Sequence, residues 1–371
     1  MLDPDAVAEA ERQFSVCNAC RYCEGFCAVF PAAEARTAFA GGDIAYLANL
    51  CHDCRMCFDA CPFTPPHEYA VNIPQLLAAA RTQTYERYGW PRAFARLLRV
   101  PAAGTASIAA LALVVLVGAA VASGGTAAFF APHAGPGAFY RVFSFAALVS
   151  GALLLTAFGL LAIAMGAVAF ARDIGLPKFS APAFARATHE AFALVYLRGG
   201  GAGCYDERRG SSSRRLMHGF VFWGFLAAFA STTAAGIEQD VLGILPPFPL
   251  LSVPVVLGVV GGVAILAGAA GLIVLKSRSD PAPQSTRMIV LDYTFLAVLA
   301  LVALSGLLLL ALRSTAAMGS LLGIHLALLV ALYLTAPYGK FVHFVYRYLS
   351  LVKHAQEART SQSASNGGSH P

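Results

Sequence analysis

Eight of the nine cysteines lie in two short runs near the N-terminus. The first run is Cys17, Cys20, Cys23 and Cys27, and the second is Cys51, Cys54, Cys57 and Cys61. Both runs have the spacing C-x2-C-x2-C-x3-C. In this spacing three thiolates from one loop hold three corners of an iron–sulfur cubane, and a fourth thiolate comes from elsewhere. The pattern predicts two [4Fe–4S] clusters.

The fourth cysteine of each run is expected to serve the other cluster, as in two-cluster ferredoxins. We therefore assign Cys17, Cys20, Cys23 and Cys61 to a first cluster, and Cys51, Cys54, Cys57 and Cys27 to a second. Structural zinc is the alternative. A zinc site needs only paired C-x2-C hooks, so it would leave the third cysteine of each run without a purpose.

From about residue 101 the chain becomes strongly apolar. Of all residues, 58% are hydrophobic and only 12% are charged, and the mean hydropathy is +0.65. Soluble proteins carry about a quarter charged residues. Six stretches are long enough to cross a hydrocarbon core of about 30 Å as helices: 103–123, 142–170, 216–237, 251–275, 289–312 and 317–337. The lipid bilayer is therefore an expected partner.

These patterns predict an all-α protein with three parts. Residues 1–100 form an α-helical domain with two [4Fe–4S] clusters and a basic connector, a diferredoxin. Residues 101–352 form a six-helix transmembrane bundle. Residues 353–371 are polar and are expected to be a disordered tail.

Positive charge alternates between the loops of the bundle. Lys and Arg residues precede the first span, lie between spans two and three and between four and five, and follow the sixth. The loop 237–250 instead carries Glu238 and Asp240. Because cytoplasmic loops are enriched in Lys and Arg, we expect a multi-pass protein of the cytoplasmic membrane with both termini and the clusters in the cytoplasm. This asymmetry accounts for the net charge of +6, so no nucleic-acid partner is expected.

Three histidines lie in or next to the spans: His218, His325 and His343. Haem iron takes axial imidazole ligands, and an ionisable residue within a span is a functional candidate by default. His325 and His343 are about 27 Å of helix rise apart and cannot share a haem. His218 and His343 lie at one depth near the cytoplasmic boundary. They are the predicted axial pair of a b-type haem, which makes the bundle cytochrome b-like.

Alternatives remain open for all three histidines. His218 and His343 are alternatively interfacial side chains that face head groups or water. His325 either ligates a second haem or hydrogen-bonds a backbone carbonyl, and no partner ligand is evident for it.

The chain lacks the common nucleotide-binding and zinc-hydrolase motifs. It contains no G-x-G-x-x-G after a predicted strand, no phosphate-binding P-loop and no H-E-x-x-H. We expect no substrate-oxidising site of its own. The two-electron chemistry would come from a partner that holds a flavin or a similar centre.

The chain resembles the tricarballylate/citrate utilisation protein B family. The resemblance covers nearly the whole chain and is carried by both cysteine runs, by RRLMHGFVFWGFLAAFASTT at 214–233 and by PYGKFVH at 337–343. It implies a membrane electron-transfer protein that reoxidises the reduced FAD of a soluble tricarballylate dehydrogenase. The electrons would pass through iron–sulfur clusters and b-type haem to the quinone pool.

One feature departs from the family pattern, which places a second histidine beside the one at the start of span three and another near its far end. This chain has Met217 at the first place, and Glu238, Gln239 and Asp240 at the second. The departure counts against a second, outer haem.

Two other functions keep the same architecture. The chain could be the membrane arm of a heterodisulfide-reductase-like or other dehydrogenase complex, or a redox sensor whose clusters report oxidation. The absence of a signalling domain argues against the sensor.

Overall fold

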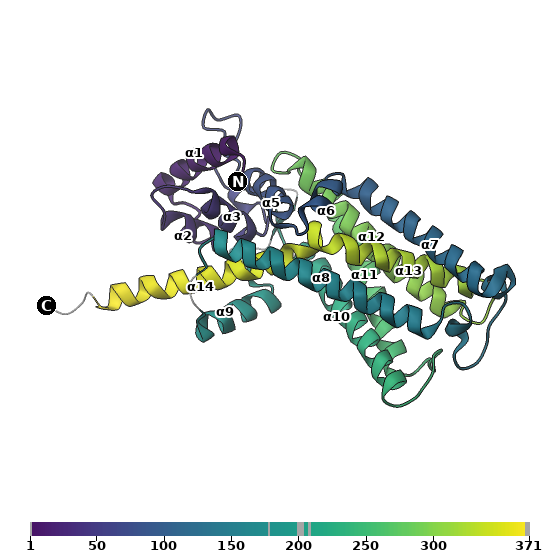
Figure 1. The fold of residues 1–371 in the computed structure, drawn as a ribbon. Coiled ribbons are helices and arrows are strands. Elements are labelled where there is room, and N and C mark those ends of the chain that lie inside the picture. Colours follow the sequence, from purple (N-terminus) through teal and green to yellow (C-terminus); the bar gives the residue numbers. More distant parts are fainter. Residues whose placement is uncertain (1, 177–178, 199–203, 207–208, 368–371) are drawn as a thin grey trace.

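A computed structural model describes residues 2–176, 179–198, 204–206 and 209–367. Figure 1 shows a compact helical domain at one end of a bundle of long helices. The helices of the compact domain and its connector are α1 (Pro4–Cys20), α2 (Val29–Glu34), α3 (Gly41–Leu50), α4 (Met56–Asp59), α5 (Ile73–Tyr88) and α6 (Arg92–Leu97). The expected helical ferredoxin region is therefore helical, and its cysteine runs lie at the ends of these helices and in the loops between them.

Six helices are long and apolar enough to cross a membrane, and they mark a multi-pass membrane protein. They are α7 (Pro101–Phe130), α8 (Phe145–Asp173), α10 (Ser213–Asp240), α11 (Val253–Arg278), α12 (Thr286–Ala311) and α13 (Met318–Thr335). Each overlaps one of the six predicted spans, with ends that differ by a few residues. In α7 the helical conformation breaks at Gly125, where φ is 76°.

The remaining elements are short, apart from the last helix. They are η1 (Ala138–Arg141), α9 (Ala181–Phe192), η2 (Val195–Arg198), β1 (Cys204–Asp206), β2 (Arg209–Ser211), η3 (Ala336–Tyr338), η4 (Lys340–Val342) and α14 (His343–Gly367). Strands β1 and β2 pair antiparallel. Apart from this hairpin, the described elements are helical, which confirms the all-α prediction.

Helices of the compact domain begin at residues that satisfy their free N–H groups. The Asp3 side chain accepts a hydrogen bond from the Asp5 N–H at the start of α1. Asn72 does the same for Gln75 at the start of α5, where Pro74 occupies the first turn. Both arrangements are favourable N-caps.

Small residues let α10 and α11 approach closely. A Cβ atom on Gly261 would lie 2.7 Å from the carbonyl oxygen of Gly224, and one on Gly268 would lie 2.6 Å from that of Met217. Such contacts hold helices together in lipid, where apolar burial alone gives no driving force. The Gly268 contact fixes the turn of α10 that precedes His218.

One hydrophobic core joins the compact domain to the bundle. Tyr85 and Tyr88 of α5 contact Tyr346 of α14, with ring centroids 6.1 and 5.8 Å apart. Phe170 of α8 stacks on Tyr346 at 4.8 Å. These four rings are at most 5% exposed and belong to the same core as the interior of α3. The two parts therefore form one packed unit.

The structure differs from the expectation of a disordered tail from residue 353. Helix α14 continues to Gly367, and Ala355 is fully buried. Glu357 pairs with Arg36 at 2.7 Å and accepts a hydrogen bond from the Tyr46 hydroxyl. Composition alone misses this, because the helix is held by contacts with a domain that is distant in sequence.

Candidate functional site

The structure brings Cys61 to the first cysteine run. Burial, followed by the charges of Cys23, Cys61 and Cys20, raises the pKa of Cys17 to about 12. The same neighbours, with burial as the largest cause, raise the pKa of Cys23 to about 12. The grouping of Cys17, Cys20, Cys23 and Cys61 is thus the one predicted for the first cluster.

The second group contains Cys27 together with Cys51, Cys54 and Cys57. These four cysteines line one pocket with about 330 Å³ of empty space, part of it at the open side, and its other walls include the apolar side chains of Val29, Phe30 and Ile73. Burial, followed by the charges of Cys54, Cys51 and Cys27, raises the pKa of Cys57 above its usual value, and Cys23 of the first group also contributes. Four clustered cysteines around a cavity fit the cubane that the spacing predicts.

Burial is the largest cause that raises the pKa values of Cys17, Cys23, Cys27 and Cys57, and the charges of neighbouring thiolates add to it. Coordination to iron supplies the missing positive charge and deprotonates the thiols. In the described part of the chain, no three His, Cys, Asp or Glu side chains converge as around a single metal ion. Cysteines around a cubane lie farther apart, since irons and sulfides separate them.

The two groups differ in exposure. Cys20 is exposed, and the neighbouring Tyr22 is 64% exposed. In the second group Cys54 is buried. The first group therefore lies at the outer surface of the compact domain, whereas the second faces the protein interior.

Left-handed residues shape the second loop. Asp53 and Arg55 have φ values of 58° and 66°, in the region that non-glycine residues rarely adopt. The turn at Asp53 directs its N–H toward the Cys51 sulfur, at 3.4 Å. Strain at such positions is typical of functional sites.

Two arginines lie beside the second group, and Arg81 is buried. Arg81 donates to the carbonyl oxygens of Ala48 and Cys51. Burial, followed by the charge of Arg81, lowers the pKa of Arg347 to about 10, while Cys51 and Cys27 act in the opposite direction. Positive charge beside a cluster stabilises its reduced form, because reduction adds a negative charge.

The second loop also contacts the membrane helices directly. Arg214, at the start of α10, donates to the Asp53 carbonyl oxygen at 2.7 Å. Arg55 donates to the Asp280 carbonyl oxygen, beyond the end of α11, at 3.2 Å. The cysteines of the second group thus lie at the junction with the bundle.

His218 and His343 face each other beside this junction. Their ring centroids are 6.4 Å apart and the rings are perpendicular. An imidazole nitrogen lies about 2 Å from a bound metal, so two axial imidazoles of one haem have nitrogens about 4 Å apart and ring centroids roughly 6 Å apart. The pair has the separation that a haem iron requires.

The hydrogen bonds of the two imidazoles suit metal ligation. Nδ1 of His343 lies 2.6 Å from the Lys340 carbonyl oxygen, which leaves Nε2 available. Burial, followed by the charge of Lys340, lowers the pKa of His343 to about 3, so its ring is neutral. Nδ1 of His218 is buried without a hydrogen-bond partner in the described structure. A metal bound to this nitrogen would give it the partner that it lacks.

His325 lies elsewhere, in the middle of α13. Its Nδ1 is 3.0 Å from the Ser305 hydroxyl of α12. A Cβ atom on Gly306 would be 3.1 Å from the imidazole, so the ring packs against α12. The structure does not bring His325 to the other two histidines. Its ring hydrogen-bonds the Ser305 hydroxyl and the backbone of Val302, which agrees with the alternative of a backbone hydrogen bond.

A buried ion-pair cluster lies close to the histidine pair. Asp292 of α12 pairs with Lys276 at 2.6 Å and with Lys340 at 2.8 Å. Asp292 is only 8% exposed. Sequence reasoning passed over this residue, although a carboxylate inside a predicted span is itself a signal of function. Arg81 and Arg347 gave no such signal, because many arginines lie near the spans.

Comparison with known proteins places the chain in a family. The family described as "Citrate utilization protein B" matches residues 97–364, and the "Citrate utilization protein B Fer4-like domain" matches residues 10–87. The chain is 42% identical to "Citrate utilization protein B" of Escherichia coli over 373 aligned residues, which cover 99% of this chain and 96% of that protein. No solved structure matches. The chain therefore belongs to the citrate utilization protein B family.

Proposed function

We propose that this protein carries electrons from a reduced flavoprotein through two [4Fe–4S] clusters and one b-type haem to a membrane quinone. The observation that carries the proposal is the contact between the second cysteine loop and the turn of α10 just before His218. Through this contact, the proposed cluster site lies next to the proposed haem site at the membrane, within one packed unit. Membership in a family with a Fer4-like domain supports an electron-transfer role in citrate utilisation.

The exposure of the cysteine groups gives the direction of transfer. Electrons enter at the first cluster, beside the exposed Cys20, and leave from the second, beside the membrane helices. The positive charges of Arg81 and Arg347 beside the second group would favour the reduced form of its cluster.

His218 and His343 would hold the haem iron, which supplies one-electron chemistry when bound. Lys340 orients His343 through its carbonyl oxygen and favours the neutral ring through its charge. The α10–α11 contact holds His218 in place. His325 is not required for this site.

The electron donor is a soluble FAD-dependent dehydrogenase, since the chain itself holds no motif for a flavin or nicotinamide. The name of the Escherichia coli relative suggests that this donor acts in the use of citrate or a similar tricarboxylate. The membrane arm of a heterodisulfide-reductase-like complex is the second candidate. It has the same carriers but a different donor.

Anaerobic reconstitution in lipid nanodiscs tests the proposal. A photoreduced flavoprotein of this kind should reduce the clusters first and the haem next, and added decylubiquinone or menadione should then reoxidise both over many turnovers. Clusters that change state once, without sustained quinone reduction, would identify the sensor instead.

The loop charges also support a proposed orientation of the protein in the membrane. One end of the bundle carries the compact domain (Figure 1). At this end α7, α10 and α12 begin, and α8, α11 and α13 end. This is the end with the Lys- and Arg-rich loops, so the clusters and both termini face the cytoplasm.

Reporter fusions after residue 280 and near residue 245 should lie on opposite sides of the cytoplasmic membrane. Equal reporter activity at the two positions would contradict this orientation.

A further inference from the structure

A pocket opens between α7, α12 and α13 at the membrane end nearest the compact domain. It has about 440 Å³ of empty space, part of it at the open side. Its walls are mostly apolar, and they include the irregular segment 336–342 between α13 and α14. Irregular backbone at membrane depth is tolerated where it is buried or lines a cavity.

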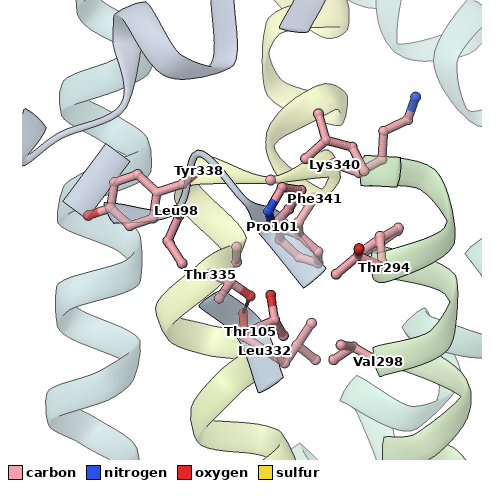
Figure 2. Close-up of a pocket in the computed structure, with 14 residues that line it drawn as sticks. Leu98, Pro101, Thr105, Thr294, Val298, Leu332, Thr335, Tyr338, Lys340 and Phe341 are labelled. Carbon is pink, nitrogen blue, oxygen red and sulfur yellow. Dashed lines mark hydrogen bonds between the residues drawn. The ribbon is translucent and has the colours of Figure 1, made fainter. Parts of the chain in front are cut away.

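Three threonines line this pocket, and one of them differs from the others. The Thr294 hydroxyl donates to the Val290 carbonyl oxygen at 2.8 Å, and Thr335 donates to that of Ala331 at 2.7 Å. Thr105 is only 6% exposed, and no described residue pairs with its hydroxyl. Figure 2 shows Thr105 at the base of the pocket among Thr335, Leu332 and Val298.

An unpaired hydroxyl in an apolar membrane pocket is unfavourable unless a bound molecule accepts its hydrogen bond. The threonine hydroxyls at 294 and 335 are already satisfied within their own helices. Thr105 is therefore the hydrogen-bond donor that the pocket offers to a ligand.

The pocket shares a wall with the histidine pair. Lys340 lines the pocket, and its carbonyl oxygen is the partner of His343 Nδ1 at 2.6 Å. Phe341 also lines it, with ring centroids 5.5 Å from Phe225 of α10 and 6.1 Å from Phe295 of α12. A ligand in the pocket would lie directly beside the proposed haem.

We propose that this pocket binds the head group of a membrane quinone, with the Thr105 hydroxyl donating to one quinone carbonyl. The inference rests on the proposed function and locates its acceptor. The apolar walls hold the ring, and the open side leaves a path for the isoprenoid tail into lipid. Few polar groups in an apolar pocket are typical of small-molecule sites.

Other occupants fit less well. A lipid chain has no acceptor for the Thr105 hydroxyl. An anionic head group would need a free cation, but Lys340 is paired with Asp292, and Figure 2 shows its ammonium group directed away from the pocket. Tyr338 is also turned away, since its hydroxyl donates to the Trp90 carbonyl oxygen at 2.8 Å.

The carriers already proposed would supply the electrons for reduction of the quinone at this site. A haem held by His218 and His343 would supply two electrons, one at a time, and water would supply the two protons that convert the quinone to the quinol. The flavoprotein supplies both electrons. Lys340, which lines the pocket, is ion-paired with Asp292.

Two variants and one matched control test the site. Thr105→Val removes the hydroxyl but keeps the side-chain shape, and Leu332→Trp fills the pocket. Thr233→Val removes a hydroxyl from the exposed face of α10, outside the pocket. Each protein is reduced with one equivalent of dithionite per carrier and mixed with decylubiquinone, and haem reoxidation is followed by absorbance. An unchanged reduced haem spectrum shows that a variant is folded.

The decylubiquinone concentration for half-maximal reoxidation should rise about three- to tenfold in Thr105→Val, as expected for one lost hydrogen bond. Leu332→Trp should slow reoxidation by quinone at least tenfold, while ferricyanide still oxidises its haem at the wild-type rate. Thr233→Val should behave as wild type.

Three results would overturn the assignment in distinguishable ways. Wild-type reoxidation in both pocket variants means that quinone binds elsewhere, and the proposed function stands. Loss of a co-purifying phospholipid from Leu332→Trp, with unchanged quinone kinetics, identifies a lipid site. A wild-type haem that ferricyanide oxidises but no quinone does refutes the proposed acceptor itself.

Discussion

Arg214 donates a hydrogen bond to the main-chain carbonyl oxygen of Asp53, at 2.7 Å. Arg214 stands one helical turn before His218, and Asp53 lies between Cys51 and Cys54. One side chain therefore ties the helix of His218 to the loop that carries the second cysteine run.

Replacing Arg214 should weaken this junction. In Arg214→Gln the charged hydrogen bond is lost, and we expect reduction of the haem by the clusters to slow severalfold, because the loop is no longer held against α10. Stopped-flow absorbance measures this rate. The control is Arg215→Gln, which removes a contact with the Ala193 carbonyl oxygen instead. Equal slowing in both variants would mean that the Arg214 contact has no special role.

The crossed assignment of the cysteines predicts which cluster each variant loses. Cys61→Ser should impair the cluster of Cys17, Cys20 and Cys23, and Cys27→Ser should impair the cluster of Cys51, Cys54 and Cys57. Two intact cubanes contain about eight iron atoms per chain, and each variant should lose about four or convert one cluster to a three-iron form. Iron analysis and EPR spectroscopy distinguish the two clusters. Cys204→Ser, outside both runs, should keep the full iron content. The uncrossed arrangement would show the reverse pattern of lost signals.

The histidines should separate cleanly in their effect on the haem. His218→Ala or His343→Ala removes an axial ligand, so the low-spin b-type absorbance should disappear while the cluster signals remain. His325→Ala should retain the spectrum, because His325 pairs with Ser305 away from the other two. Loss of the spectrum in His325→Ala alone would place the haem deeper in the membrane.

Stability should fall in mild acid partly through His354 of α14. This side chain is 8% exposed, and burial lowers its pKa below the usual 6.5. The unfolded chain therefore binds a proton that the folded chain excludes, and the folded state loses stability as the pH drops below about 6.5. His354→Gln should reduce the difference in unfolding temperature between about pH 7.5 and pH 5.5. The difference should not vanish, since burial also lowers the pKa of His52.

Local patterns predicted much of this architecture. The cysteine spacing and the six apolar stretches depend on short segments, and the structure has helices where the spans were expected. The pairing of His218 with His343 could be anticipated because membrane depth restricts which residues can meet. The grouping of Cys61 with the first run follows from a general property of the ferredoxin spacing.

Contacts between distant segments could not be predicted in the same way. The Arg36–Glu357 pair orders the last helix, but it joins residues at opposite ends of the chain. The roles of Arg81 and Arg347 depend on the fold of the second loop. The unpaired hydroxyl of Thr105 becomes apparent only when α7, α12 and α13 are assembled around it.

The shared core of Tyr85, Tyr88, Phe170 and Tyr346 has a kinetic consequence. A carrier domain on a flexible tether must search for its acceptor, and its rate then depends on linker length and solvent viscosity. Here the spacing between the second cysteine group and the histidine pair is set when the chain folds. In the proposed electron path, the step between these two sites would not depend on diffusion, whereas the arrival of the donor and the exchange of quinone would.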